Sequence, residues 1–256
     1  MMKKFNHEVD TYFNIEDAKI YYEIRGREDK PVLLFLHGGF GTIEDFNDIT
    51  DSLSNEFTLV GVDSRGHGKS TLGSAQLTYE QIQKDVEQLL RHLKIDTLSI
   101  IGFSDGGIVT YRLAALSSLN IEKLVTVGAE WHVRSLESVK GIFAKITSES
   151  WKEKFPGSYN SYQRLNPEPD FELFTQRILS MWLDESPTGF PNEAVQHISC
   201  PMLFVRGEND HLVSEKSLTE LSEIVSDSRF VNIPGAGHVV FQDEKEKFIK
   251  HLDEFL

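Results

Sequence analysis

The sequence is poor in cysteine and in basic residues. Its single cysteine, Cys200, excludes an internal disulfide framework and any metal cluster built from several cysteines. The 26 lysine and arginine residues are outnumbered by 40 aspartate and glutamate residues, so the formal net charge is −14. Such an acidic chain repels nucleic-acid backbones and anionic lipid, and we expect neither as a partner.

Long apolar runs are missing as well. No window approaches the roughly 18 consecutive apolar residues that a membrane-spanning helix needs. The first residues turn polar at once and lack the apolar core of a signal peptide. Yet 39% of the 256 residues are hydrophobic, which is enough for a full core. We therefore expect a soluble, cytoplasmic globular protein, whose oligomeric state the sequence leaves open.

Short apolar runs bounded by glycine or proline recur along the chain. Such runs are typical of strands that are buried on both faces of a parallel sheet. Residues 11–25 instead alternate polar and apolar, and they predict two strands with a turn near Glu16 and Asp17. The buried runs lie at 32–36, 57–62, 98–101, 124–127, 202–205 and 229–233. Together these segments predict a mostly parallel eight-stranded sheet.

Helical periodicity separates the predicted strands. It is clearest at 78–93, where apolar residues recur on one face and Thr78 and Gln81 fit a capping box. The same pattern appears at 105–118, 214–225 and 241–255. Alternation of strands and helices implies right-handed βαβ units. The fold class is therefore α/β, with helices on both faces of the sheet.

Residues 130–197 interrupt this alternation. They hold all three tryptophans and five of the eight prolines, and helical periodicity appears only at 135–146 and 170–183. We interpret the segment as a small helical cap inserted into a core domain made of residues 1–129 and 198–256. Its large apolar side chains either line a pocket or form the core of the cap, and we expect core for most of them. They are Trp131, Phe143, Trp151, Phe155, Phe174, Met181 and Trp182.

A Gly-x-Ser-x-Gly motif spans residues 102–106, between a predicted strand and a predicted helix. The abrupt change of direction leaves Ser104 at the tip of a strained turn. Side chains at Gly102 and Gly106 would clash across that turn, and the helix N-terminus favours developing negative charge. The motif alone also fits an ordinary glycine-rich turn, but its position between strand and helix favours a nucleophile.

A serine nucleophile needs an imidazole to take its proton. His238 ends a compact glycine loop directly after the last predicted strand, and it is our candidate base. His37 lies in an earlier glycine loop, where we expect its ring to support the neighbouring backbone, and His67 has no acid placed after it. His132 and His211 are candidates for the pocket. We expect the others at the surface: His7, His92, His197 and His251.

The acid of the site should fix the tautomer of the imidazole. Asp210 follows a late strand, at the same edge of the sheet as Ser104 and His238. Glu208, two residues earlier, and Glu130, after the preceding strand, are the competing carboxylates. Asp210 can also be interpreted as a helix cap or a loop carboxylate. We nevertheless favour Asp210 over Glu208 and Glu130 as the acid.

Acyl transfer also needs two N–H donors aimed at the developing oxyanion. One is expected from Asp105, the residue after the nucleophile. The other is expected from the glycine loop at 37–41, where Gly39 is our choice and Phe40 the alternative. The carboxylate of Asp105 has two interpretations of its own: it attracts a substrate ammonium, or, as we prefer, it caps its own helix.

The sequence resembles the α/β-hydrolase superfamily. The matching blocks are residues 37–39, 63–70, 102–107, 207–210 and 235–238. The chain order Ser104, Asp210, His238 is the one expected for this fold. The resemblance implies an α/β-hydrolase fold with a helical cap and no cofactor or metal. The block at 63–70 is similar to a structural turn of capped members, here held by Asp63 and Arg65.

The serine at position 104 argues against the similar dehalogenases and epoxide hydrolases, which carry aspartate there. The resemblance implies a serine hydrolase of small or medium esters, lactones or amino-acid esters, acting through an acyl-enzyme on a small-molecule substrate. A C–C bond hydrolase and a cofactor-free perhydrolase are alternatives among enzymes, and a small-molecule receptor with little turnover is an alternative of another class. The pocket candidates are Phe40, Phe103, Trp131, His132, Trp182 and His211.

Overall fold

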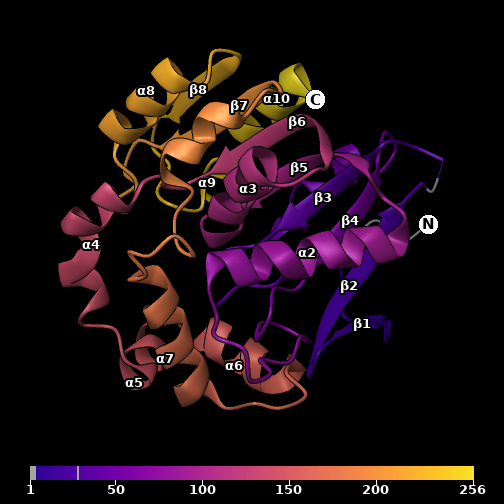
Figure 1. Cartoon of the computed structure of the whole chain (residues 1–256), viewed down its shortest axis with the longest axis vertical. Coiled ribbons are helices and arrows are strands. Elements are labelled where there is room, and N and C mark those ends of the chain that lie inside the picture. The colour runs from indigo at the N-terminus through magenta and orange to yellow at the C-terminus, as the bar shows by residue number, and fades with distance from the viewer. Residues whose placement is uncertain (1–3, 28) are drawn as a thin grey trace.

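The structure, a computed structural model, describes residues 4–27 and 29–256. Within these residues eight strands form one sheet in the order β1-β2-β4-β3-β5-β6-β7-β8 (Figure 1). The strands are β1 (Tyr12–Ile15), β2 (Ala18–Gly26), β3 (Val32–Leu36), β4 (Thr58–Val62), β5 (Thr97–Phe103), β6 (Asn120–Val127), β7 (Met202–Gly207) and β8 (Ser228–Ile233). The β1–β2 and β2–β4 pairs are antiparallel and all later pairs are parallel. The predicted mostly parallel eight-stranded sheet is confirmed.

The helices alternate with the strands as the periodicity predicts. They are α1 (Thr50–Leu53), α2 (Tyr79–Leu93), α3 (Asp105–Leu116), α4 (Leu136–Phe143), α5 (Ser148–Lys154), α6 (Pro156–Leu165), α7 (Phe171–Trp182), α8 (Glu215–Ile224), α9 (Val240–Asp243) and α10 (Lys245–Phe255), with the 3-10 helices η1 (Ile43–Phe46), η2 (Val133–Ser135) and η3 (Asn192–His197). The single helix expected over 241–255 is two helices, because Glu244 has a non-helical φ of −136° and ψ of 54°. No helix in the described ranges has the length and apolar character that crossing a bilayer requires.

Only half of the capping box predicted for α2 is present. Thr78 accepts the N–H of Gln81 at 3.0 Å. The side chain of Gln81 does not return to Thr78, because it donates to Asp85 at 2.9 Å. The helix start is therefore held by a single cap bond.

The central strands bury both of their faces. In β3, Leu34 and Leu36 belong to one hydrophobic cluster, whereas Leu33 and Phe35 belong to a second cluster. Alternate side chains point to opposite faces of a strand, so the two clusters occupy opposite faces of the sheet. This explains why the strand sequences are continuous apolar runs and why helices cover both faces.

The parallel strands bring distant parts of the chain to one edge of the sheet. Strand β5 ends directly before Ser104, β7 ends three residues before Asp210, and β8 ends five residues before His238. Because parallel strands share a direction, the loops that leave their carboxyl ends meet at the same edge. The site described below lies at this edge.

Helices α4 to α7 lie between β6 and β7 in the chain and gather at the left and bottom of the molecule in Figure 1. The sequence predicted α4 and α7 but neither α5 nor α6. Aromatic stacking joins this group to the glycine loop, since the rings of Phe40 and Trp151 stack with their centroids 3.9 Å apart. We propose residues 130–197 as the cap of the fold.

The N-terminal segment is anchored by a buried histidine. His7 is only 5% exposed, and its ring lies 2.6 Å from Glu44 Oε1 through Nδ1 and 2.7 Å from Asp63 Oδ2 through Nε2. Burial lowers the pKa of His7, but the two carboxylates more than offset it and raise this pKa to about 9. The expectation that His7 lies at the surface is wrong, because sequence periodicity does not reveal that the N-terminal segment crosses to Asp63.

The turn at 63–70 has the structural role that the resemblance implies. Asp63 accepts the N–H groups of Ile43 at 3.0 Å and Lys69 at 2.8 Å. Arg65 donates two hydrogen bonds to Asp85, at 2.8 and 2.7 Å. The turn is thereby tied to η1 and to α2.

Candidate active site

Ser104 lies in a strained turn between β5 and α3. Its φ of 50° and ψ of −116° are outside the regions that non-glycine residues usually occupy. A Cβ atom on Gly106 would lie 2.0 Å from the carbonyl oxygen of Leu36, and one on Gly102 would lie 2.2 Å from Thr110 Oγ1. Both glycines are therefore required where the backbone folds back on itself, for the steric reason that the motif predicts.

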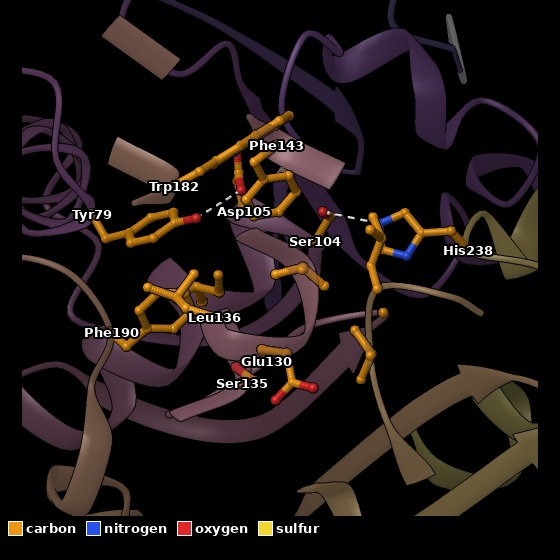
Figure 2. Close-up of a pocket in the computed structure, with 15 residues that line it drawn as sticks. Tyr79, Ser104, Asp105, Glu130, Ser135, Leu136, Phe143, Trp182, Phe190 and His238 are labelled. Carbon is orange, nitrogen blue, oxygen red and sulfur yellow. Dashed lines mark hydrogen bonds between the residues drawn. The ribbon is translucent and has the colours of Figure 1, made fainter. Parts of the chain in front are cut away.

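Hydrogen bonds join Ser104, His238 and Asp210 in a line. Ser104 Oγ lies 3.1 Å from His238 Nε2 (Figure 2), and His238 Nδ1 lies 2.9 Å from Asp210 Oδ2. The other oxygen of Asp210 accepts the N–H groups of Leu212 at 2.8 Å and Val213 at 3.3 Å. Burial raises the pKa of Asp210, but the hydrogen bond and electrostatic interaction with His238, together with the N–H groups of Leu212 and Val213, outweigh it and hold this pKa below its usual value.

The two competing carboxylates bond elsewhere. Glu130 accepts the N–H of Ser214 at 3.1 Å and the hydroxyl of Ser217 at 2.5 Å, and burial raises its pKa. Glu208 accepts the N–H of Gly235 at 3.1 Å. In the part of the chain that the structure describes, His238 has its carboxylate contact with Asp210 alone.

Two further buried histidines, His37 and His67, bond to backbone groups. His37 Nδ1 lies 2.7 Å from the carbonyl oxygen of Gly38, and its Nε2 accepts the N–H of Ser64 at 3.0 Å. This is the supporting role predicted for His37. His67 is buried against that ring, and burial lowers the pKa of His67 to about 3, so it stays neutral.

Three backbone N–H groups beside Ser104 are free of acceptors. Among the described residues, the N–H groups of Gly39, Phe40 and Asp105 donate to no protein oxygen. A Cβ atom on Gly39 would lie 2.6 Å from Asp105 Oδ2 and 2.7 Å from Trp182 Cζ2, so a glycine is required there. Free donors held at a helix N-terminus can receive a developing oxyanion.

The side chain of Asp105 does not cap α3. Its Oδ1 accepts the hydroxyl of Tyr79 at 2.9 Å and its Oδ2 accepts the indole N–H of Trp182 at 2.8 Å (Figure 2). Burial raises the pKa of Asp105, although both hydrogen bonds lower it in part. The capping interpretation is wrong because these two donors draw the carboxylate away from its helix. Tyr79 was missed by the sequence analysis, since nothing in its own segment distinguishes it from a core residue of α2.

Two cavities reach Ser104 and His238, one of about 770 Å³ and one of about 70 Å³. Of the pocket candidates, Phe40, Phe103, Trp182 and His211 line the large cavity, and Trp182 lines the small one too.

The remaining two pocket candidates, Trp131 and His132, line neither of these cavities. Trp131 is 2% exposed and donates its indole N–H to the carbonyl oxygen of Ser217 at 2.9 Å. Trp131 is therefore a core residue, and its only polar side-chain atom, the indole nitrogen, has a hydrogen-bond partner. His132 faces away to Glu193, with Nε2 at 3.0 Å from Oε1.

The expectation that most large apolar side chains of the insertion form its core is confirmed only in part, because several of them both pack against the core and line a cavity. Four of the seven line the cavities at Ser104: Phe143, Trp151, Phe155 and Trp182. Trp131, Phe174 and Met181 are buried in the hydrophobic core, whereas Phe143, Trp151 and Trp182 are partly buried and pack against it. Helical periodicity identifies an apolar face, but it does not tell whether that face meets another helix or a cavity.

Two curated proteins and one solved structure resemble this chain over most of its length. Esterase YbfF of Escherichia coli (strain K12) is 25% identical over 240 residues, which cover 89% of this chain and 93% of that protein. Serine hydrolase BPHL of Homo sapiens is 29% identical over 255 residues, which cover 94% of this chain and 84% of that protein. The crystal structure of the enol-lactonase from Burkholderia xenovorans LB400 superimposes with a TM-score of 0.75 at 20% identity, covering 96% of this chain and 99% of that one.

The likeness to the solved structure concerns the fold, here the eight-stranded sheet described above. The sequence model of the alpha/beta hydrolase fold matches residues 31–180, which is more than half of the 256 residues. On these grounds, this chain belongs to the α/β hydrolase fold family.

Proposed function

We propose that this protein is a serine hydrolase that cleaves a carboxylic ester through an acyl-enzyme. One observation carries the proposal: a serine in a strained turn is hydrogen bonded to a histidine at 3.1 Å, and that histidine is hydrogen bonded to a buried aspartate at 2.9 Å. Relatives named as an esterase and as a serine hydrolase support the same chemistry.

In the first half of the reaction, Asp210 accepts the Nδ1–H of His238 and thereby leaves Nε2 free to take a proton. Ser104 Oγ transfers its proton to Nε2 and bonds to the carbonyl carbon of the ester. The carbonyl oxygen becomes negative and accepts the N–H groups of Gly39 and Asp105. These donors are fixed before the reaction, so no reorganisation is needed when charge develops.

In the second half, the tetrahedral intermediate collapses and the bond to the alcohol oxygen breaks. His238 returns the proton to that oxygen, and the alcohol leaves. A water molecule then attacks the acyl-enzyme with His238 as its base. The products are the free acid and regenerated Ser104, and no cofactor takes part in the proposed steps.

The proposal is tested with Ser104→Ala on short p-nitrophenyl esters. The variant should lose about 10³-fold or more in kcat and should no longer react covalently with a fluorophosphonate probe. Ser52→Ala is the matched control, because Ser52 is exposed on α1 and its hydroxyl donates to the backbone oxygen of Ile49. Substantial turnover by purified, folded Ser104→Ala would overturn the assignment.

The same experiment separates an enzyme from a receptor. Covalent labelling together with rapid turnover supports the hydrolase. Tight ligand binding with negligible turnover of every ester supports a receptor, in which the hydrogen-bonded side chains no longer perform catalysis.

A further inference from the structure

The two cavities at Ser104 are unequal in size and separated by a common wall. Phe143, Trp182 and Leu212 line both of them, as do Ser104 and His238. An ester carbonyl bonded to Ser104 carries two substituents, the acyl chain and the alcohol. The cavity volumes, about 70 and 770 Å³, therefore give these substituents very different room.

The position of His238 decides which substituent enters which cavity. The alcohol oxygen must come within hydrogen-bond reach of His238 Nε2 to receive its proton. The large cavity is walled by Gly237 and Val239, the neighbours of His238 on both sides, whereas the small cavity is walled by Asp105 and Ile108 of α3. The alcohol accordingly belongs in the large cavity, and the acyl chain in the small cavity above the first turn of α3.

The volume of the small cavity limits the length of the acyl chain. A protein cavity of about 150 Å³ accepts benzene, which has six carbons. A cavity of about 70 Å³ is roughly half as large and holds a chain of about two to four carbons. Its deeper wall is apolar, formed by Ile108, Leu136, Val139 and Phe190, two of which are labelled in Figure 2.

The charge of the small cavity limits the kind of acyl chain. Asp105 and Glu130 both line it, and they are 7% and 9% exposed. Each carboxyl group already accepts hydrogen bonds from protein donors. Among the described residues no lysine or arginine lines this cavity. A second carboxylate in the acyl chain would be buried beside two acids, which is strongly unfavourable.

The large cavity is mainly apolar and, unlike the small one, is lined by a lysine as well as an acid. Ten apolar side chains line it, together with the charged side chains of Asp45 and Lys154. The apolar ones are Phe40, Phe103, Ile142, Phe143, Ile146, Trp151, Phe155, Trp182, Leu212 and Val239. Aromatic walls bury much area and suit ring systems and long apolar groups.

We propose that the substrates are esters of a short, uncharged acyl group of about two to four carbons with a bulky apolar alcohol. This inference rests on the proposed function and adds to it the orientation of the ester and the sizes of its two parts. The structure assigns the control of acyl length to the small cavity, with Val139 and Leu136 of α4 at its wall.

A pair of isomers tests the orientation directly. Octyl acetate and methyl nonanoate have the same atoms, but they place the long chain on opposite sides of the ester. We expect kcat/KM to be at least about tenfold higher for octyl acetate, because a pocket distinguishes single methylene groups by about tenfold or more. Equal or faster hydrolysis of methyl nonanoate would overturn the inference. A butyrate ester should likewise exceed the corresponding succinate monoester by about tenfold or more.

Two variants of residues on α4 test which side chains limit the length of the acyl chain. Val139 lines only the small cavity, whereas Ile142, one turn further along α4, lines only the large one. Val139→Ala should raise the ratio of kcat/KM for hexanoate over acetate about fivefold or more, with the alcohol unchanged. Ile142→Ala should leave that ratio as in the parent protein. If Val139→Ala does not fold, Leu136→Ala enlarges the same cavity and carries the same expectation.

Labelling by a fluorophosphonate probe distinguishes the two ways to fail. If the parent protein is neither labelled nor active on any ester, the proposed function itself fails. If it is labelled and active but prefers long acyl chains, or if both alanine variants change the acyl ratio equally, only the present inference fails.

Discussion

Trp182 donates its indole N–H to Asp105 Oδ2 at 2.8 Å, and so the last residue of α7 is bonded to the residue that follows Ser104. The same indole packs against Phe143, with ring centroids 4.8 Å apart. The backbone N–H of Asp105 is one of the free donors beside the nucleophile. This hydrogen bond therefore ties the end of α7 to the turn that holds Ser104.

Trp182→Phe removes this donor but keeps an aromatic ring in both cavities. We expect the free energy of unfolding to fall by about 1–3 kcal/mol, because the buried carboxylate of Asp105 loses one of its two partners. We also expect a lower kcat, because the N–H of Asp105 is less firmly placed. Urea denaturation and steady-state kinetics measure the two effects. Trp151→Phe is the control, since Trp151 lines the same cavity but bonds only to the hydroxyl of Ser158, at 3.3 Å.

Asp105→Asn distinguishes positioning of the turn from recognition of a cation. We expect kcat/KM to fall in parallel for an alanine ester and for an isobutyrate ester of the same alcohol, because both oxygens of Asp105 already accept protein donors. A selective loss on the cationic alanine ester, by about tenfold more than on the neutral ester, would instead establish that the carboxylate binds a substrate ammonium.

Asp210→Asn and Glu130→Gln compare two buried acids of the site. Asp210→Asn should lower kcat by about 10³-fold to 10⁴-fold, since an amide does not hold the histidine in the required tautomer. Glu130→Gln should lower kcat by less than about tenfold, because Glu130 bonds Ser214 and Ser217 rather than His238. Activity on one ester at neutral pH measures both, and equal losses would show that the acid has been misassigned.

His7→Gln should change how stability depends on pH. The folded-state pKa of His7 is raised from 6.5 to about 9, so its stabilisation is complete below pH 6.5 and is lost as the pH rises through about 9. We expect the stability advantage of the parent protein over the variant to shrink by about 3 kcal/mol between pH 6 and pH 10. Urea denaturation across this range measures it. His197→Gln, at an exposed position, should follow the parent curve at every pH.

Local patterns were enough to predict the strands and the turn at Ser104. Continuous apolar runs identify buried strands such as β3 and β5, because a strand covered on both faces has no polar side to show. The glycines around Ser104 reflect a clash between atoms only a few residues apart in the chain or in adjacent strands. The clash at Gly102 is with Thr110 in the same short segment, whereas the clash at Gly106 is with Leu36 on the neighbouring strand β3.

The roles of His7, Tyr79 and Trp131 did not follow from the same reasoning. Each depends on a partner far away in the chain: Asp63 for His7, Asp105 for Tyr79, and Ser217 for Trp131. Helix α2 shows an apolar face, but that pattern does not say which of its residues reaches the carboxyl group beside the nucleophile.

The amino-acid sequence by itself determined the α/β architecture and the chain order of Ser104, Asp210 and His238, because periodicity and turn chemistry are properties of neighbouring residues. Only the tertiary structure decided that Asp105 is bonded to Tyr79 and Trp182, and that a small and a large cavity meet at the serine. Those features arise from packing between segments with long stretches of chain between them. The shape of a cavity depends on every side chain that lines it. Because these side chains come from distant segments, no single segment encodes that shape.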